Sequence, residues 1–291
     1  MPSHQPAILA APAKAGRFLA FGLQPGADPR PAIGRLAAAR LAEETVIGLG
    51  QPVVEAVGAR VPGLRTFPAI AGAGVSFPST QGALWAFVGS ADSGESLHRA
   101  RALRDLLGEA FRADEDVLSF EYAGGHDLSG YEDGTENPRE EKAVAAAIVG
   151  GGPLAGSSFV AAQRWVHELS SLERMSAAER DHVIGRRREG NEEIADAPAS
   201  AHVKRTAQES FDPPGFMVRR SMPWGHLGEH GLYFVAYVAD LDVYERTLRR
   251  MAGLEDGVVD ALTRFTRPVS GGYYWCPAVR QGRLDLRPIG V

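Results

Sequence analysis

The segment Leu84–Asp92, LWAFVGSAD, has a counterpart 148 positions later in Leu232–Asp240, LYFVAYVAD. Each segment is an aromatic-rich strand pattern that ends in Ala-Asp and leads into a helical pattern with several arginines, over 97–107 and 243–251. Because the offset is about half of the chain, the match indicates an internal duplication of a β-α-β unit. Two unrelated strand–helix units can also look alike, so the repeat alone leaves both interpretations open.

Further elements are expected on both sides of the two repeated segments. A helix is predicted over 31–49, where apolar residues recur at helical spacing and Asp28-Pro29 supplies a start. Runs rich in aromatic and β-branched residues predict further strands over 17–23, 117–122, 157–166 and 217–222. Strand and helix patterns therefore alternate along both halves of the chain.

Composition excludes several classes of protein. With 291 residues, 44% of them hydrophobic and 23% charged, the chain can bury a sizeable core in one or two domains. A net charge of −5 argues against a nucleic-acid protein held by phosphate contacts. No apolar stretch approaches the roughly 18 residues that span a bilayer, and the N-terminus makes a poor signal peptide. The sequence therefore predicts a cytoplasmic protein with no membrane partner.

A single cysteine, Cys276, excludes an internal disulfide framework and any cysteine-rich zinc or iron–sulfur site. It lies in a strand-like run, YYWCPA, and is expected to be a core thiol. No Gly-x-Ser-x-Gly nucleophile motif is present.

A glycine-rich segment, 123–156, separates the two halves and holds several carboxylates between Asp127 and Glu136. Tyr131 breaks the oxygen-ligand pattern of an EF-hand loop, and no lysine follows the glycines as in a phosphate-binding loop. A common Asp/Gly turn and a functional loop both fit these residues. The charged segment 186–198 is expected to be a solvated surface loop.

Eight histidines are the available metal ligands, and spacing selects none of them. His226 and His230 have the spacing of a helical metal pair, but the glycines around them predict a loop. No second histidine follows His167 at metalloprotease spacing, and His98 and His182 are expected on solvated helix faces. The adjacent pair Arg219-Arg220 fits either a surface patch or a cation aimed into a cavity.

Four elements in order carry a resemblance to a known family. The segment 130–138, GYEDGTENP, resembles the G-x-x-D-G-T-E-N-P signature of dye-decolourising peroxidases. The spacing from Asp133 to His202 and on to Arg219, 69 and 17 positions, is similar to that of the family's haem proteins. The segments 219–225, RRSMPWG, and 264–274, RFTRPVSGGYY, resemble elements of the family's type B members. The resemblance extends from about Pro6 to Pro277.

This resemblance implies an α+β protein with a duplicated ferredoxin-like fold, which has two four-stranded antiparallel sheets and peripheral helices. The expected parts are an N-terminal half over 1–125, a connecting loop over 126–156 and a haem-binding C-terminal half over 157–291. One haem b per chain is implied in the C-terminal half.

The resemblance also implies roles for particular residues. His202 is the expected proximal iron ligand, with Asp260 holding its Nδ1–H. Asp133 and Arg219 are expected on the distal side for proton transfer and charge stabilisation, with Ser221 where many type B members have asparagine. The remaining expected contacts to haem come from Gly134 and Thr135 of the signature, Arg205 as a propionate partner and Phe234 over the distal face.

The implied activity is reduction of hydrogen peroxide to water at the expense of dyes, phenolic compounds or other one-electron donors. The implied partners are therefore peroxide and a small-molecule reductant, and a homo-oligomer is expected. Two alternatives stay open at this point. One is a haem-storing or iron-releasing protein with incidental peroxidase activity, and the other is an oligomeric ferredoxin-like binding module without haem.

Overall fold

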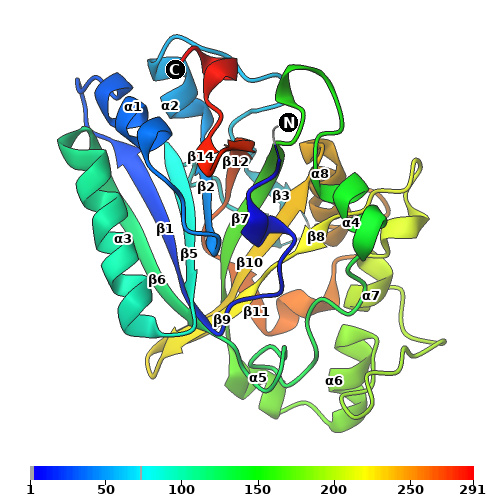
Figure 1. Cartoon of the computed structure of the whole chain (residues 1–291). Coiled ribbons are helices and arrows are strands. Elements are labelled where there is room, and N and C mark those ends of the chain that lie inside the picture. The colour runs from blue at the N-terminus through cyan, green and yellow to red at the C-terminus, as the bar shows by residue number, and fades with distance from the viewer. Residues whose placement is uncertain (1–2, 73) are drawn as a thin grey trace.

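The computed structural model describes residues 3–72 and 74–291, and its N-terminal half has a four-stranded antiparallel sheet (Figure 1). The strand order in this sheet is β2-β5-β1-β6. The strands are β1 (Ala15–Leu23), β2 (Thr45–Leu49), β5 (Leu84–Ser90) and β6 (Phe111–Phe120). Helices α1 (Arg30–Ala38) and α3 (Ser93–Leu107) cover one face of the sheet, with α2 (Gln51–Ala56) after β2.

The C-terminal half repeats this arrangement. Its four-stranded sheet has the order β9-β10-β7-β12, with helix α8 (Leu241–Met251) after β10 as α3 follows β5. The strands are β7 (Ser158–His167), β9 (Met222–His226), β10 (Glu229–Val238) and β12 (Gly272–Cys276). In both halves the first and third strands of the unit are the central pair, which is the ferredoxin-like order. The predicted duplication is confirmed, and the strands of each half fall within the limits 1–125 and 157–291.

The two sheets join at both of their edges. β6 pairs with β9 through Ser119 and Trp224, and β2 pairs with β12 through Leu49 and Trp275. In the described residues the eight strands therefore form one closed ring. Two short strands, β8 (Val218–Arg219) and β11 (Thr266–Pro268), pair with β10 and β7 outside the ring.

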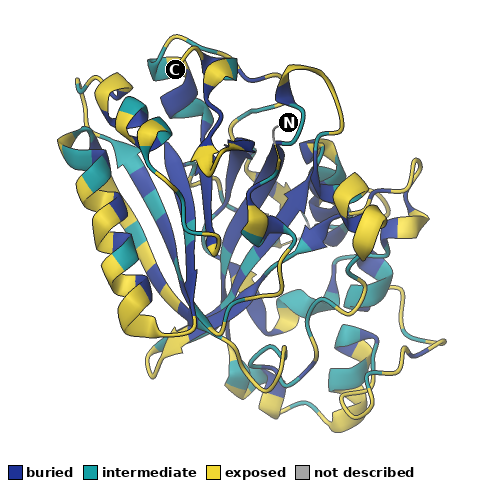
Figure 2. Ribbon diagram, in the orientation of Figure 1, coloured by how far each residue is buried: buried dark blue, intermediate teal, exposed yellow. Residues whose placement is uncertain are grey.

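Most strands of the ring are buried on both faces, as the dark-blue strands of Figure 2 show, whereas β6 has several exposed residues. Successive residues of a strand point to opposite faces, so the strands buried on both faces contribute to an inner and an outer core. In the inner core the Phe18 and Tyr233 rings stack at 4.0 Å, and the Trp85 indole N–H donates to the Tyr233 hydroxyl at 3.3 Å. Trp85 and Tyr233 occupy equivalent positions of the two repeated segments, so the two copies contact each other at the same position of the repeat.

The helix predicted over 31–49 is wrong in its second part. Helix α1 ends at Ala38, and Val46 and Ile47 lie in β2, whose five residues are all buried. A short apolar run that is buried on both faces has no helical or alternating period of its own, so spacing could not identify it. The run 217–222 is likewise divided between β8 and β9, and β6 begins earlier than expected, at Phe111.

The connections hold the remaining elements. Helix α4 (Glu140–Ala147) lies in the glycine-rich segment, where no regular element was expected. Between β7 and β8 the chain runs through α5 (Leu169–Glu173), α6 (Ala177–Ile184) and α7 (His202–Arg205). Two small hairpins complete the described elements, β3 (Ile70–Gly72) with β4 (Val75–Phe77) and β13 (Val279–Arg280) with β14 (Arg283–Leu284). Among the described residues, no helix has the length and apolar character needed to cross a membrane.

The N-terminal segment is fixed to the ring by Gln5, whose side chain is fully buried. Its amide nitrogen donates to the carbonyls of Ile47 and Pro277, at 2.8 and 3.0 Å, and its amide oxygen accepts from the Ile47 N–H at 2.7 Å. One side chain thus ties the chain start to both halves.

We predict that Gln5→Ala lowers the free energy of unfolding by about 2–4 kcal/mol, because it leaves buried backbone groups of Ile47 and Pro277 without partners. Urea unfolding measures the change. Gln24→Ala, at an exposed turn, is the matched control and is expected to stay within about 0.5 kcal/mol of the parent. Equal stability of the Gln5 and Gln24 variants would contradict this account.

Candidate functional site

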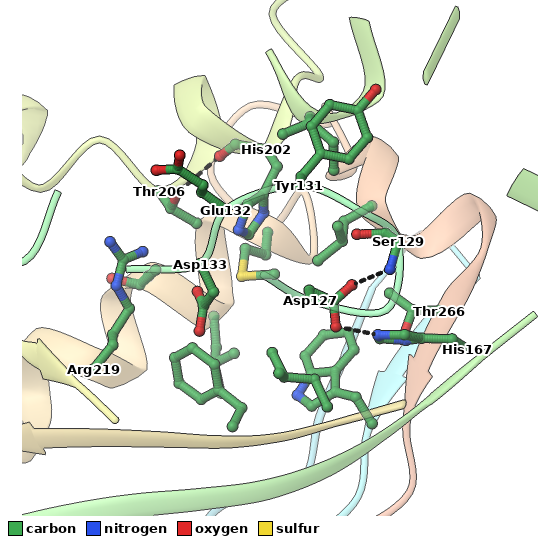
Figure 3. Close-up of a pocket in the computed structure, with 18 of the residues that line it drawn as sticks. Asp127, Ser129, Tyr131, Glu132, Asp133, His167, His202, Thr206, Arg219 and Thr266 are labelled. Atoms are coloured by element: carbon green, nitrogen blue, oxygen red, sulfur yellow. Dashed lines mark hydrogen bonds and ion pairs between the residues drawn. The ribbon is translucent and has the colours of Figure 1, made fainter. Parts of the chain in front are cut away.

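A deep cleft lies on the outer face of the C-terminal sheet. It encloses about 950 Å³ of empty space, part of it open to solvent, between strands β7 and β10, helices α7 and α8, and the loop that follows β6. Because strand residues alternate, Trp165 and His167 of β7 and Leu232 and Phe234 of β10 point to this same side. Most of the wall is apolar, and its polar side chains include His202, the pair Asp133 and Arg219, and the pair Asp127 and His167 (Figure 3).

The first polar group is His202 with Asp260. His202 begins the short helix α7, and its ring points into the cleft (Figure 3). Its Nδ1 lies 2.8 Å from Oδ2 of Asp260, a carboxylate that is fully buried and also accepts the N–H of Leu262 at 2.9 Å. The carboxylate fixes the ring orientation and holds the proton on Nδ1. The second ring nitrogen, Nε2, is then available as a ligand to a metal.

The second group is Asp133 with Arg219, which lie together across the cleft from His202 (Figure 3). Asn137, from the same loop as Asp133, clamps the backbone of Arg219. The Arg219 N–H donates to Oδ1 of Asn137 at 2.8 Å, and Nδ2 of Asn137 donates to the Arg219 carbonyl at 3.0 Å. Nε of Arg219 is buried and has no hydrogen-bond partner among the described residues.

Gly134 explains why the loop turns sharply between Asp133 and Asn137. Its φ is +75°, and a Cβ there would lie 2.9 Å from Nδ2 of Asn137. A side chain at this position would therefore strain the backbone and displace the amide that holds Arg219.

The Asp133 carboxyl is shifted toward its neutral form. Burial raises the pKa of Asp133 and the nearby charge of Asp127 raises it further, whereas the charge of Arg219 lowers it. The net pKa lies above the ordinary value of an aspartate. A carboxyl placed in this way can accept a proton and release it again within the same cleft.

The third group, Asp127, His167 and Thr266, was not predicted from the sequence. Nε2 of His167 lies 2.9 Å from Oδ1 of Asp127, and Nδ1 lies 2.6 Å from the Thr266 hydroxyl. Asp127 also accepts the N–H of Ser129 at 2.9 Å. Burial opposes ionisation of Asp127, but the hydrogen bond and charge of His167 outweigh it and hold the pKa of this carboxyl below its ordinary value. The only sequence feature that could have indicated His167 is the alternation of side chains along its strand, which places it on the same face as Trp165.

The other predicted site residues have different surroundings. Phe234 lines the cleft and stacks on Tyr244 at 5.7 Å. Gly134, Thr135, Arg205 and Ser221 do not line it. Thr135 accepts from Asn191, and the Ser221 hydroxyl accepts the N–H of Val235 at 3.3 Å. Arg205 is buried and forms a two-pronged pair with Asp256 at 2.7 and 2.8 Å.

Two further expectations need correction. His226 and His230 lie on the paired strands β9 and β10 rather than in a loop, and no metal-binding cluster of histidine, cysteine or acidic residues occurs in the described ranges. The segment 186–198 is not simply solvated, because it packs on the signature loop. There Arg186 pairs with Glu136, and Asn191 donates to Glu132 at 2.7 Å. Cys276 is a buried thiol, as predicted.

We predict that Asp127→Asn lowers the free energy of unfolding at neutral pH by about 1–3 kcal/mol, because the ionised carboxylate holds both His167 and the Ser129 N–H. A lowered folded-state pKa stabilises the fold above the unfolded pKa, near 4, and this contribution is lost as pH falls through the folded value. Urea unfolding at several pH values should show the difference shrinking in acid. Asp105→Asn, at an exposed helix position, is the control, and a pH-independent difference would refute the role of the charge.

Comparisons with known proteins identify the family of this chain. Residues 125–281 match the family model described as "Dyp-type peroxidase, C-terminal", which covers more than half of the chain. The dye-decolorizing peroxidase of Mycobacterium tuberculosis is 31% identical over 230 residues, 76% of this chain and 69% of the relative. That of Brevibacterium linens is 29% identical over 93% of this chain and 80% of its own.

Solved structures give the same result. DyPB from Rhodococcus jostii RHA1 superposes with a TM-score of 0.86 at 28% identity, covering 94% of this chain and 96% of that chain. A variant of that protein, solved in complex with heme, has the same TM-score. A dye-decolorizing protein from Vibrio cholerae gives 0.84 at 29% identity, over 93% and 96% of the two chains. The resemblance to type B agrees with the DyPB structures. The chain therefore belongs to the dye-decolourising peroxidase family, as a DyP-type peroxidase with haem as its cofactor.

Proposed function

We propose that the cleft described above is the haem site and that Nε2 of His202 would hold the haem iron. The residues present fit such a group. The apolar walls suit a porphyrin, and the pairing of Nδ1 with Asp260 leaves Nε2 of His202 as the basic nitrogen. The opposite wall offers the Asp133 carboxyl and a guanidinium whose buried Nε has no partner among the described residues. This opposition of His202–Asp260 to Asp133–Arg219 carries the proposal.

Asp260 is proposed to act through His202. A carboxylate that accepts Nδ1–H increases the electron density on Nε2 and fixes the direction of its lone pair. Because Asp260 is fully buried and its other oxygen caps the turn at Leu262, it holds this position without help from solvent.

When bound, haem supplies an iron centre that passes electrons from a reductant to hydrogen peroxide. We propose that Asp133 would take a proton from one oxygen of the peroxide and deliver it to the other oxygen, which leaves as water. Arg219 stabilises the negative charge that develops as the O–O bond breaks. Arginine suits this position because it stays charged in a dry cleft.

The proposed reductants are dyes, phenolic compounds and other donors of single electrons. The names of the curated relatives, dye-decolorizing peroxidases, support this class of donor. A homo-oligomer and a cytoplasmic location stay predictions from the sequence.

We predict that Asp133→Asn slows the reaction of the haem-loaded protein with peroxide about 10²–10⁴-fold, because the proton carrier is lost. Arg219→Leu is expected to slow it about 10²–10³-fold, because the developing charge loses its partner. Rapid mixing of protein and peroxide, followed through the haem absorption, measures both rates. Arg246→Leu, on an arginine that stacks on Phe211 away from the cleft, is the control. If both cleft variants reacted like the parent, this distal assignment would be wrong.

The pH dependence of that rate separates the two roles. Asp133 must be ionised to accept the proton, so the parent rate should fall in acid with a midpoint above that of an ordinary aspartate. The midpoint should move to higher pH in Arg219→Leu, because the charge of Arg219 lowers the Asp133 pKa, and to lower pH in Asp127→Asn. An unchanged midpoint in both variants would exclude Asp133 as the titrating base.

We predict that His202→Ala retains haem at least tenfold less well than the parent after gel filtration, because its axial ligand is missing. The haem absorption per mole of protein measures the loss. His182→Ala, at an exposed position of α6, is the matched control. Full haem retention by the His202 variant would refute its role as ligand. If the parent protein retains its haem fully but reacts slowly with peroxide, the haem-storage alternative would be favoured.

A further inference from the structure

Arg219 and Arg220 are consecutive in the sequence but serve different cavities. Arg219 lines the cleft described above, whereas Arg220 lines a second one, which we name the N-terminal cleft. It holds about 750 Å³ of empty space, part of it open to solvent, between the segment Pro6–Ala13 and the side chains of Phe18, Phe87, Met222 and Tyr237. Neighbouring residues of an extended chain point to opposite faces, which explains the separation.

The Arg220 guanidinium is held in place but its charge is not balanced. Nη1 donates to the Arg219 carbonyl and Nη2 to the Leu9 carbonyl, both at 2.9 Å. Nε is buried without a hydrogen-bond partner, and no carboxylate of the described residues lies within ion-pair distance of Arg220. Burial lowers the pKa of Arg220, as expected for a cation that is withdrawn from water.

A comparison within the molecule shows what is missing. Arg205 is buried, and Asp256 neutralises it through two hydrogen bonds, whereas Arg220 is only partly buried. Nε has no hydrogen-bond partner among the described residues in either arginine, so the difference between them is the countercharge, which a guanidinium withdrawn from water normally has. The Arg220 guanidinium donates to two neutral carbonyls and faces a cavity rather than a carboxylate. A negatively charged group bound in the N-terminal cleft would neutralise its charge.

The other walls restrict which anion fits. Proline and alanine side chains of Pro6–Ala13 and the rings of Phe18 and Phe87 make the cleft largely apolar around Arg220. Glu43 and Glu44 also line it, but both are exposed at its rim, and Glu44 pairs with Arg99 at 3.1 Å. An acidic rim repels a small, multiply charged anion such as phosphate. A single carboxylate on an apolar body meets much less repulsion and gains contact with the aromatic wall.

We propose that the N-terminal cleft binds a small organic carboxylate, with its carboxyl group on Arg220 and its apolar body against Phe18 and Phe87. The site lies on the opposite face of the strand from Arg219, so the proposal does not depend on the proposed peroxide chemistry. The carbonyl of Arg219 accepts from both Asn137 and Arg220, which links the backbone of Arg219 to the N-terminal cleft.

The test is calorimetric titration of the haem-loaded protein with benzoate and hexanoate. Binding is expected for these carboxylates, at least tenfold weaker binding for neutral benzamide and for phosphate, and at least tenfold weaker benzoate binding in Arg220→Gln. Arg35→Gln, an exposed arginine that also donates to two backbone carbonyls, is the matched control and should bind like the parent. Benzoate should leave the haem absorption unchanged and should still bind Arg219→Leu, which excludes binding in the haem cleft.

Several outcomes would overturn the proposal. They are the absence of binding by either carboxylate, equal binding of benzamide, parental affinity in Arg220→Gln, and a benzoate-induced change in the haem spectrum that is lost in Arg219→Leu. If Arg220→Gln does not fold, Ala7→Leu replaces it, because a larger side chain at Ala7 narrows the cleft and leaves the arginine itself in the chain. Tenfold weaker benzoate binding in that variant supports the site, and parental affinity refutes it.

Discussion

The alternation of side chains along β7 and β10 is the constraint on which the rest of the structure depends. Each strand is buried on both faces, so each alternate residue must suit a different environment. In β10, Tyr233 points into the ring, where it stacks on Phe18, while Phe234 points into the cleft. A shift of one residue in strand register would move the side chains of the ring core to the wall of the cleft, and those of the wall into the core. The pairings that close the ring therefore also fix the site.

The cleft lies where the two halves differ in the connection that follows their first strand. In the N-terminal half, β1 leads through α1 to β2, and α1 packs beside α3 over the sheet. In the C-terminal half, the connection after β7 is much longer and carries the short helices α5, α6 and α7. It approaches the sheet only through residues such as His202, which leaves space between α7 and the strands. The N-terminal unit thus has its sheet face covered by helices, whereas the same face of the C-terminal unit forms the cleft.

The sequence predicted the parts of this arrangement that have a local pattern. The repeated segments 84–92 and 232–240 identified the two units, and the signature around Asp133 identified the family through its resemblance. Two features had no such pattern. The strand containing Val46 and Ile47 is buried on both faces, and a period cannot be recognised where every residue is apolar. His167 meets Asp127 across 40 positions of sequence, and only the fold brings them together.

The role of Asn137 shows why the signature needs its particular length. The side chain of Asp133 lines the cleft. The side chain of Asn137 instead forms hydrogen bonds with the backbone of Arg219, which lies on a strand 82 positions later in the sequence. Because Gly134 turns the chain with a positive φ and leaves room for that amide, carboxyl and guanidinium are fixed relative to each other by one short loop. The same Arg219 carbonyl also receives Nη1 of Arg220 from the far side of the strand. The backbone at Arg219 is therefore held by Asn137 of the signature loop and by Arg220 of the N-terminal cleft, so replacing the Arg220 side chain would act directly on a group that positions Arg219. The two adjacent arginines therefore belong to two separate clefts, and the backbone carbonyl of Arg219 connects them.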